Sequence, residues 1–72
     1  MLQDIINIIC DYVEVAPEEI NENSSLRNDI GASSFDLMNI AVEIERRYHV
    51  RMPDDRLPLV KTVGGIMQLI SA

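Results

Sequence analysis

The sequence predicts an all-α fold: a small four-helix bundle with three longer helices, one short third helix and a long loop between the first two helices. Two observations lead to this prediction. Apolar residues recur at the three-and-four spacing of one helical face in three separate stretches. The chain has 72 residues, which suits a single domain covering residues 1–72, with a core that supplies about 3–5 kcal/mol of net stability.

The charge of the chain argues against some classes of partner. It carries 12 acidic and 6 basic residues, a formal net charge of −6, which disfavours binding to nucleic acid and to anionic membrane surfaces. The excess lies in residues 1–22, which hold six acids and no basic residue. The longest apolar runs are too short to span a bilayer, so no membrane insertion is expected. Cys10 is the single cysteine, which excludes an internal disulfide framework and fits a reducing cytoplasm.

The first helix is predicted over residues 2–14. It ends at Ala16-Pro17, because the residue before proline avoids the helical region. Its apolar face consists of Leu2, Ile5, Ile6, Ile9, Tyr12 and Val13. Residues 15–33 then form a long connection, which in a compact domain is usually functional. The apolar residues of this loop are spaced too irregularly for a helix, although each can pin the loop onto the core: Val15, Ile20, Leu26 and Ile30.

The second helix is predicted over residues 34–49. Ser33 is its expected N-cap, and Asp36 stands where an acid can complete a capping box. Its apolar residues form two stripes. The broad stripe suits the core and consists of Leu37, Ile40, Ala41, Ile44 and Tyr48. The narrow stripe, Phe35, Met38 and Val42, is either buried by a small bundle or exposed as a docking surface.

The last two elements are shorter. Pro53 can begin one helical turn over residues 53–57, and Pro58 prevents much continuation. Thr62 is expected to cap a final helix over residues 63–70, whose inward face consists of Val63, Ile66, Met67 and Ile70. Gly64 and Gly65 weaken its first turn. They either permit close packing against the turn over residues 53–57 or are tolerated at a fraying helix end.

Catalysis finds little support in the residues. His49 is the only histidine, and at a helix C-terminus its ordinary role is a favourable interaction with the helix dipole. No nucleophile and base can be assembled around it, and no cluster of cysteine and histidine offers a metal site. We therefore expect no enzyme activity, no catalytic residue and no bound metal.

A serine at the start of the second helix is the most informative feature. In Gly31-Ala32-Ser33-Ser34-Phe35 a turn opens into the helix and leaves a serine hydroxyl at the first exposed position. A phosphate attached there gains from the N–H groups and the dipole of the helix terminus, and Gly31 has no Cβ to crowd the turn. A serine in this place is also the commonest helix cap.

The order of elements and four short motifs resemble an acyl carrier protein over nearly the whole chain. In that family a Gly-x-Asp-Ser-Leu motif carries the serine that is joined to phosphopantetheine, and here the motif is Gly31-Ala32-Ser33-Ser34-Phe35. Ile44-Glu45-Arg46-Arg47-Tyr48 resembles the hydrophobic-Glu-x-x-aromatic stretch of the family. Met52-Pro53 and Lys61-Thr62-Val63 resemble its Ile-Pro and Thr-Val pairs.

The resemblance implies a carrier that holds an acyl group as a thioester on a 4'-phosphopantetheine arm, which coenzyme A donates to Ser34. It implies as partners a phosphopantetheinyl transferase and the acyl-loading, condensing or transferase enzymes of fatty-acid, polyketide or related biosynthesis. We expect the carrier to be a cytoplasmic monomer. The surface expected to bind these partners comprises Phe35, Asp36, Met38, Val42 and Glu45. An acyl chain is expected to fold back between the second and third helices onto Ile40, Ile44, Leu57 and Met67.

This chain departs from the family pattern at two places. Ser33 stands where the family has Asp, so it can cap the helix but supplies no carboxylate to a modifying enzyme. Arg46 and Arg47 offset the acids of the second helix, so we expect partners to recognise its apolar stripe more than its charge. Two alternatives remain open: a peptidyl or D-alanyl carrier that also uses Ser34, and an unmodified helical interaction module in which Ser34 only caps.

Overall fold

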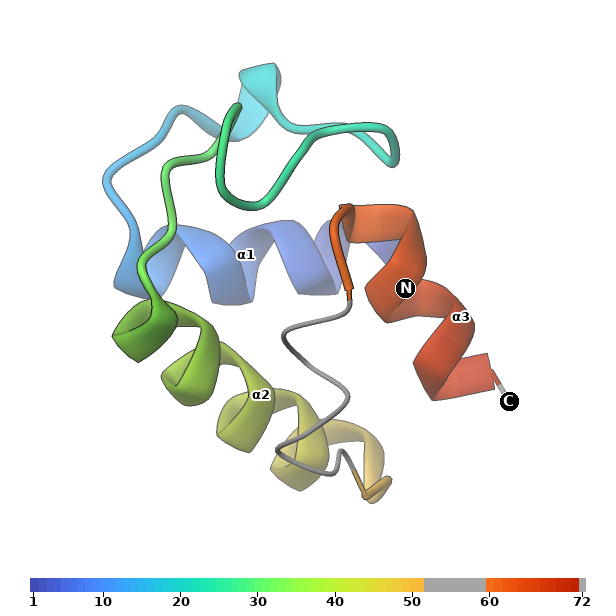
Figure 1. The fold of residues 1–72 in the computed structure, drawn as a ribbon. Coiled ribbons are helices and arrows are strands. Elements are labelled where there is room, and N and C mark those ends of the chain that lie inside the picture. The colour runs from blue at the N-terminus through green and yellow to red at the C-terminus, as the bar shows by residue number, and fades with distance from the viewer. Residues whose placement is uncertain (52–59, 72) are drawn as a thin grey trace.

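The computed structural model describes residues 1–51 and 60–71, and within these ranges the chain forms three α-helices around one core. Helix α1 spans Leu2–Tyr12, α2 spans Ser34–Tyr48 and α3 spans Val63–Ser71, and a short 3-10 helix, η1, covers Pro17–Glu19. Figure 1 shows the long loop on one side of α1 and α2 on the other, and α1 packs against both α2 and α3. The all-α class and the three longer helices are confirmed. The turn predicted over residues 53–57 lies outside the described residues.

The helix ends match the predicted boundaries closely. Helix α1 ends two residues earlier than predicted, because Val13 is already extended, with φ −126° and ψ 136°. Helix α2 ends at Tyr48, one residue earlier than predicted, and its C-cap residue His49 adopts the left-handed conformation with φ 54°. At the start of α3, the hydroxyl oxygen of Thr62 accepts a 3.1 Å hydrogen bond from the N–H of Gly65, so the predicted cap is confirmed.

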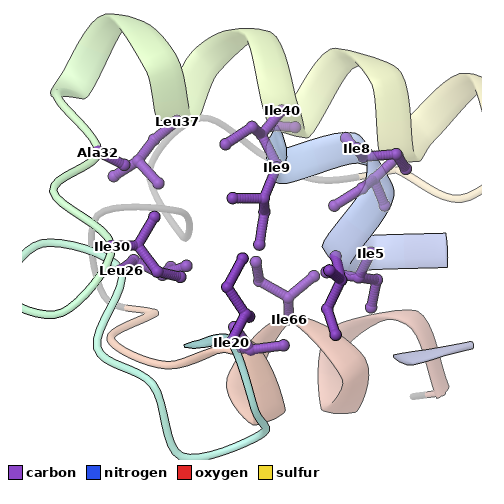
Figure 2. Close-up of a cluster of buried hydrophobic side chains, with 14 residues drawn as sticks. Ile5, Ile8, Ile9, Ile20, Leu26, Ile30, Ala32, Leu37, Ile40 and Ile66 are labelled. Atoms are coloured by element: carbon purple, nitrogen blue, oxygen red, sulfur yellow. The ribbon is translucent and has the colours of Figure 1, made fainter. Parts of the chain in front are cut away.

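All three helices contribute to the hydrophobic core. The buried residues of the helices are Ile5, Ile6, Ile8 and Ile9 from α1, Leu37, Ile40, Ala41 and Ile44 from α2, and Val63 and Ile66 from α3. Figure 2 shows several of these side chains converging from the three helices. The stripe of α2 predicted to face the core is confirmed, with Tyr48 half-buried at its end. Ile8 is buried although it lies outside the face predicted for the first helix.

The long loop is held to the core by its own apolar residues. Ile20, Leu26 and Ile30 are buried, and Figure 2 shows them pointing at the same cluster as the helical side chains. Val15 is half-buried against this core. The prediction that these residues pin the loop onto the core is therefore confirmed.

Backbone hydrogen bonds also join the loop to the start of α3. The N–H of Leu26 donates to the carbonyl of Lys61 at 2.9 Å, and the N–H of Gly64 donates to the carbonyl of Glu22 at 2.8 Å. A Cβ added to Gly64 would lie 3.1 Å from that same carbonyl oxygen. The loop backbone therefore packs closely against Gly64.

Polar contacts tie α1 to α2 at their exposed edges. The Tyr48 hydroxyl donates to Oδ2 of Asp4 at 3.1 Å, and Nη2 of Arg47 lies 3.7 Å from Oδ1 of the same carboxylate. The Tyr12 hydroxyl donates to Oε1 of Glu43, also at 3.1 Å.

In the described part of the chain, no helix has the length and apolar character needed to cross a membrane.

Candidate functional site

Ser33 caps α2 and forms a capping box. Its backbone is extended, with φ −82° and ψ 171°. Its hydroxyl oxygen accepts a 3.1 Å hydrogen bond from the N–H of Asp36, and its own N–H donates to Oδ2 of Asp36 at 3.0 Å. Both predicted roles are confirmed, and two of the N–H groups at this helix end have side-chain acceptors.

Ser34, the first residue of α2, is exposed and takes no part in the capping box. Its hydroxyl oxygen accepts a hydrogen bond from Nη2 of Arg27 at 2.7 Å. An N–H at this position of a helix has no carbonyl partner within the helix. Ser34 therefore presents its hydroxyl to solvent beside a cation and the positive end of a helix, an environment that favours an attached phosphate.

The turn before the helix leaves space for an attached group. Gly31 has φ +80°, a conformation that glycine adopts without steric cost. A Cβ built on Gly31 would have no protein atom within 4 Å. Glycine is therefore needed here for the shape of the turn, and the surface beside the turn is open.

Arg27 is the site residue that the sequence analysis missed. It is exposed in the long loop, seven residues before Ser34, and no motif includes it. One signal was available. Arg27 is the only basic residue among the first 45 of an acidic chain, so its place in the long loop before the candidate serine was informative.

A cavity of about 270 Å³ lies beside this end of α2. Among the described residues, Arg27 and Lys61 are the charged members of its lining, together with Ser25, Asn28, Leu37 and Val60. Of the residues predicted to shelter an acyl chain, Ile40, Ile44 and Met67 do not line this cavity. Ile40 and Ile44 have no exposed surface, Met67 is half-buried against the core, and Leu57 lies outside the described residues.

The narrow apolar stripe of α2 is exposed. Phe35, Met38 and Val42 retain 70%, 62% and 51% of their accessible surface. These residues are not part of the core, so of the two interpretations left open by the sequence, the buried one is excluded. Asp36 is half-buried in the capping box, and Glu45 is half-buried farther along the helix.

Three titratable side chains outside the attachment site have raised pKa values. Burial and the hydrogen bond to Asp4 raise the pKa of Tyr48, with Arg47 acting in the opposite direction. The hydrogen bond to Glu43 is the main reason for the raised pKa of Tyr12. Burial raises the pKa of the Cys10 thiol, which disfavours the thiolate that a reactive cysteine needs.

Comparison with known proteins gives one consistent result. The family model described as the phosphopantetheine attachment site matches residues 3–70. The acyl carrier protein of Amoebophilus asiaticus is 35% identical over 68 residues, which cover 94% of this chain and 85% of the relative. The acyl carrier protein of Coprothermobacter proteolyticus is 33% identical over 72 residues, with 100% and 88% coverage. That of Lactobacillus acidophilus is 34% identical over 68 residues, with 94% and 85% coverage.

Proposed function

This chain belongs to the phosphopantetheine-bearing family of acyl carrier proteins, and on that premise we propose that Ser34 carries its 4'-phosphopantetheine arm. The observation that supports this assignment is the division of labour between two adjacent serines. The Ser33 hydroxyl is committed to the capping box, whereas the Ser34 hydroxyl is exposed. The open surface beside Gly31 and the Arg27 guanidinium suit a phosphodiester at this position.

Attachment uses coenzyme A as donor and a phosphopantetheinyl transferase as catalyst. The oxygen of Ser34 forms a bond to the phosphorus on the pantetheine side of coenzyme A. The bond from that phosphorus to the bridging oxygen of the diphosphate breaks, and adenosine 3',5'-bisphosphate leaves with the bond's electron pair. The hydroxyl proton passes to a base of the transferase, and this chain contributes the nucleophile and its position.

The carried group is an acyl chain held as a thioester on the thiol of the arm. The chain acts as a monomeric carrier and leaves catalysis to acyl-loading, condensing or transferase enzymes of fatty-acid, polyketide or related biosynthesis. The tether keeps the acyl group at high effective concentration near its partners. An aminoacyl or D-alanyl cargo on the same arm is the alternative.

Partners dock on the exposed face of α2 beside the arm. The stripe of Phe35, Met38 and Val42 begins one residue after Ser34 and is largely exposed, as expected of an interaction surface. Asp36 and Glu45 flank it. The fold-back site for a long acyl chain involves Ile40, Ile44, Leu57 and Met67. Because Ile40 and Ile44 have no exposed surface, a chain can reach them only by separating packed side chains.

The test is incubation of the purified protein with coenzyme A, magnesium and a broad-specificity phosphopantetheinyl transferase, followed by intact-mass measurement. The expected result is a gain of one phosphopantetheine group. An unchanged mass, with an established carrier protein modified in the same preparation, would support the unmodified helical module instead. Hydroxylamine treatment of the protein purified from its own cells then releases the cargo, and an amine in the released hydroxamate identifies an aminoacyl carrier.

A further inference from the structure

Arg27 is placed to contact more than the serine hydroxyl. Its Nη2 lies 2.7 Å from Oγ of Ser34, and a guanidinium carries five N–H donors in a planar fork. Both side chains are exposed, so the contact brings the loop cation to the surface where a group on Ser34 would lie. Any anion bonded to that oxygen is within reach of the remaining donors.

Two carboxylates of this region are already hydrogen-bonded to backbone N–H groups. Oδ2 of Asp29 accepts a 2.7 Å hydrogen bond from the N–H of Ser25, and Oδ2 of Asp36 accepts one from the N–H of Ser33. Within residues 1–51 and 60–71, no carboxylate oxygen lies within ion-pair distance of the Arg27 guanidinium. Among the described residues, Arg27 therefore has no carboxylate partner.

A second cation lies at the same place. Lys61 and Arg27 both line the cavity of about 270 Å³ beside α2. In a chain with a net charge of −6, two basic side chains thus border one cavity close to the exposed serine. Arg27, which bonds to Ser34, therefore connects this basic cavity to the exposed serine.

We propose that Arg27 binds the phosphodiester formed on Ser34, and that it holds the start of the arm on the cavity side of α2. The inference rests on the proposed function of Ser34. Modification removes the hydroxyl proton and adds an anionic phosphate, and a guanidinium bonds more strongly to a phosphate oxygen than to a neutral hydroxyl. Arg27 is then a positioning residue that stabilises the modified protein more than the unmodified one.

The test compares the wild-type protein, Arg27→Gln and Arg27→Lys. Arg51→Gln is the matched control, because Arg51 is also exposed and its replacement removes the same charge elsewhere. Each protein is unfolded in urea before and after modification. We expect modification to raise the folding equilibrium constant of the wild type about two- to five-fold more than that of Arg27→Gln, as for an exposed ion pair. Arg51→Gln should match the wild type, and Arg27→Lys should recover part of the effect.

Phosphorus NMR of the modified proteins gives a second measurement, whose result would not depend on Arg27 if this residue had only a structural role. The phosphodiester resonance should shift in Arg27→Gln and stay in place in Arg51→Gln. Added salt should move the wild-type resonance toward that of Arg27→Gln, because salt screens an exposed ion pair. If all four proteins are modified and their resonances and stabilities agree, the proposal for Arg27 is wrong, and the proposal that Ser34 carries the arm is unaffected. If the wild type accepts no arm, both proposals fail.

Discussion

Ser33 and Asp36 exchange two hydrogen bonds across the first turn of α2, at 3.1 Å and 3.0 Å. The pair satisfies backbone groups that would otherwise lack partners at the helix end. Ser34 lies next to Ser33 but is not used in this arrangement. Two adjacent serines therefore have separate physical roles, one in stability and one at the surface.

Replacement of Ser33 by alanine should destabilise the fold by about 0.5–2 kcal/mol, the usual cost of a lost helix cap. Urea unfolding of the unmodified protein measures this. Ser33→Asp is the control, because aspartate also caps helices and should retain most of the stability. Equal stability of Ser33→Ala and the wild type would mean that the capping box contributes nothing.

Ionisation of Tyr48, which bonds from α2 to Asp4 of α1, should lower the stability of the fold at high pH. Burial and the hydrogen bond to Asp4 raise the pKa of Tyr48 in the folded protein. The stability that Tyr48 contributes is therefore fully present below the ordinary tyrosine pKa of about 10. It is lost as the pH rises from there through the higher folded pKa. Urea unfolding between about pH 8 and 11, a range that brackets this pKa, should show a smaller loss of stability in Tyr48→Phe than in the wild type. Identical slopes would contradict the linkage.

The two glycines of α3 should respond differently to alanine. Alanine favours a helix over glycine by about 1 kcal/mol, but at position 64 its Cβ would lie 3.1 Å from the backbone oxygen of Glu22. That oxygen is held by the hydrogen bond from Gly64 itself. At position 65 the close neighbour is a side-chain methyl of Val60, at 3.0 Å, which can turn away. Gly64→Ala should thus be less stable than Gly65→Ala in thermal unfolding, and the reverse order would be evidence against close packing at Gly64.

The exposed stripe of α2 should matter for binding and little for stability. Met38→Ala should change the free energy of unfolding by no more than about 0.5 kcal/mol, because Met38 is 62% exposed. It should weaken binding to the phosphopantetheinyl transferase by about 1 kcal/mol or more, and by more than Glu45→Gln does. Titrations at about 0.1 M and 1 M salt separate apolar from ionic docking. A steep salt dependence with no effect of Met38→Ala would show that charge dominates.

The sequence was sufficient for the helices and the cap because both depend on local rules. The spacing of Leu37, Ile40 and Ile44 requires one buried helical face, and Ser33 with Asp36 has the side chains of a capping box. The link between Leu26 and Lys61 was not predictable, because backbone groups of any residue can form it. The contact of Arg27 with Ser34 depends on how the loop folds over α1, which local patterns do not determine.

The exposure of the narrow stripe was also beyond the sequence. Periodicity places Phe35, Met38 and Val42 on one face of α2, but only the packing of the other elements determines whether that face is covered. Figure 1 shows the long loop on the other side of α1 from α2. The role proposed for Ser34 rests on motif and position together, because a serine at a helix start is far more often only a cap.

The central claim, that Ser34 bears the arm and Ser33 does not, is tested most directly by modifying the wild type, Ser34→Ala and Ser33→Ala side by side. Each protein is incubated to completion with coenzyme A and the transferase, and its intact mass and peptide fragments are measured. The assignment of the arm to Ser34 predicts one added phosphopantetheine in the wild type and in Ser33→Ala, located on Ser34, and none in Ser34→Ala. An added group in Ser34→Ala that is missing from Ser33→Ala would contradict it.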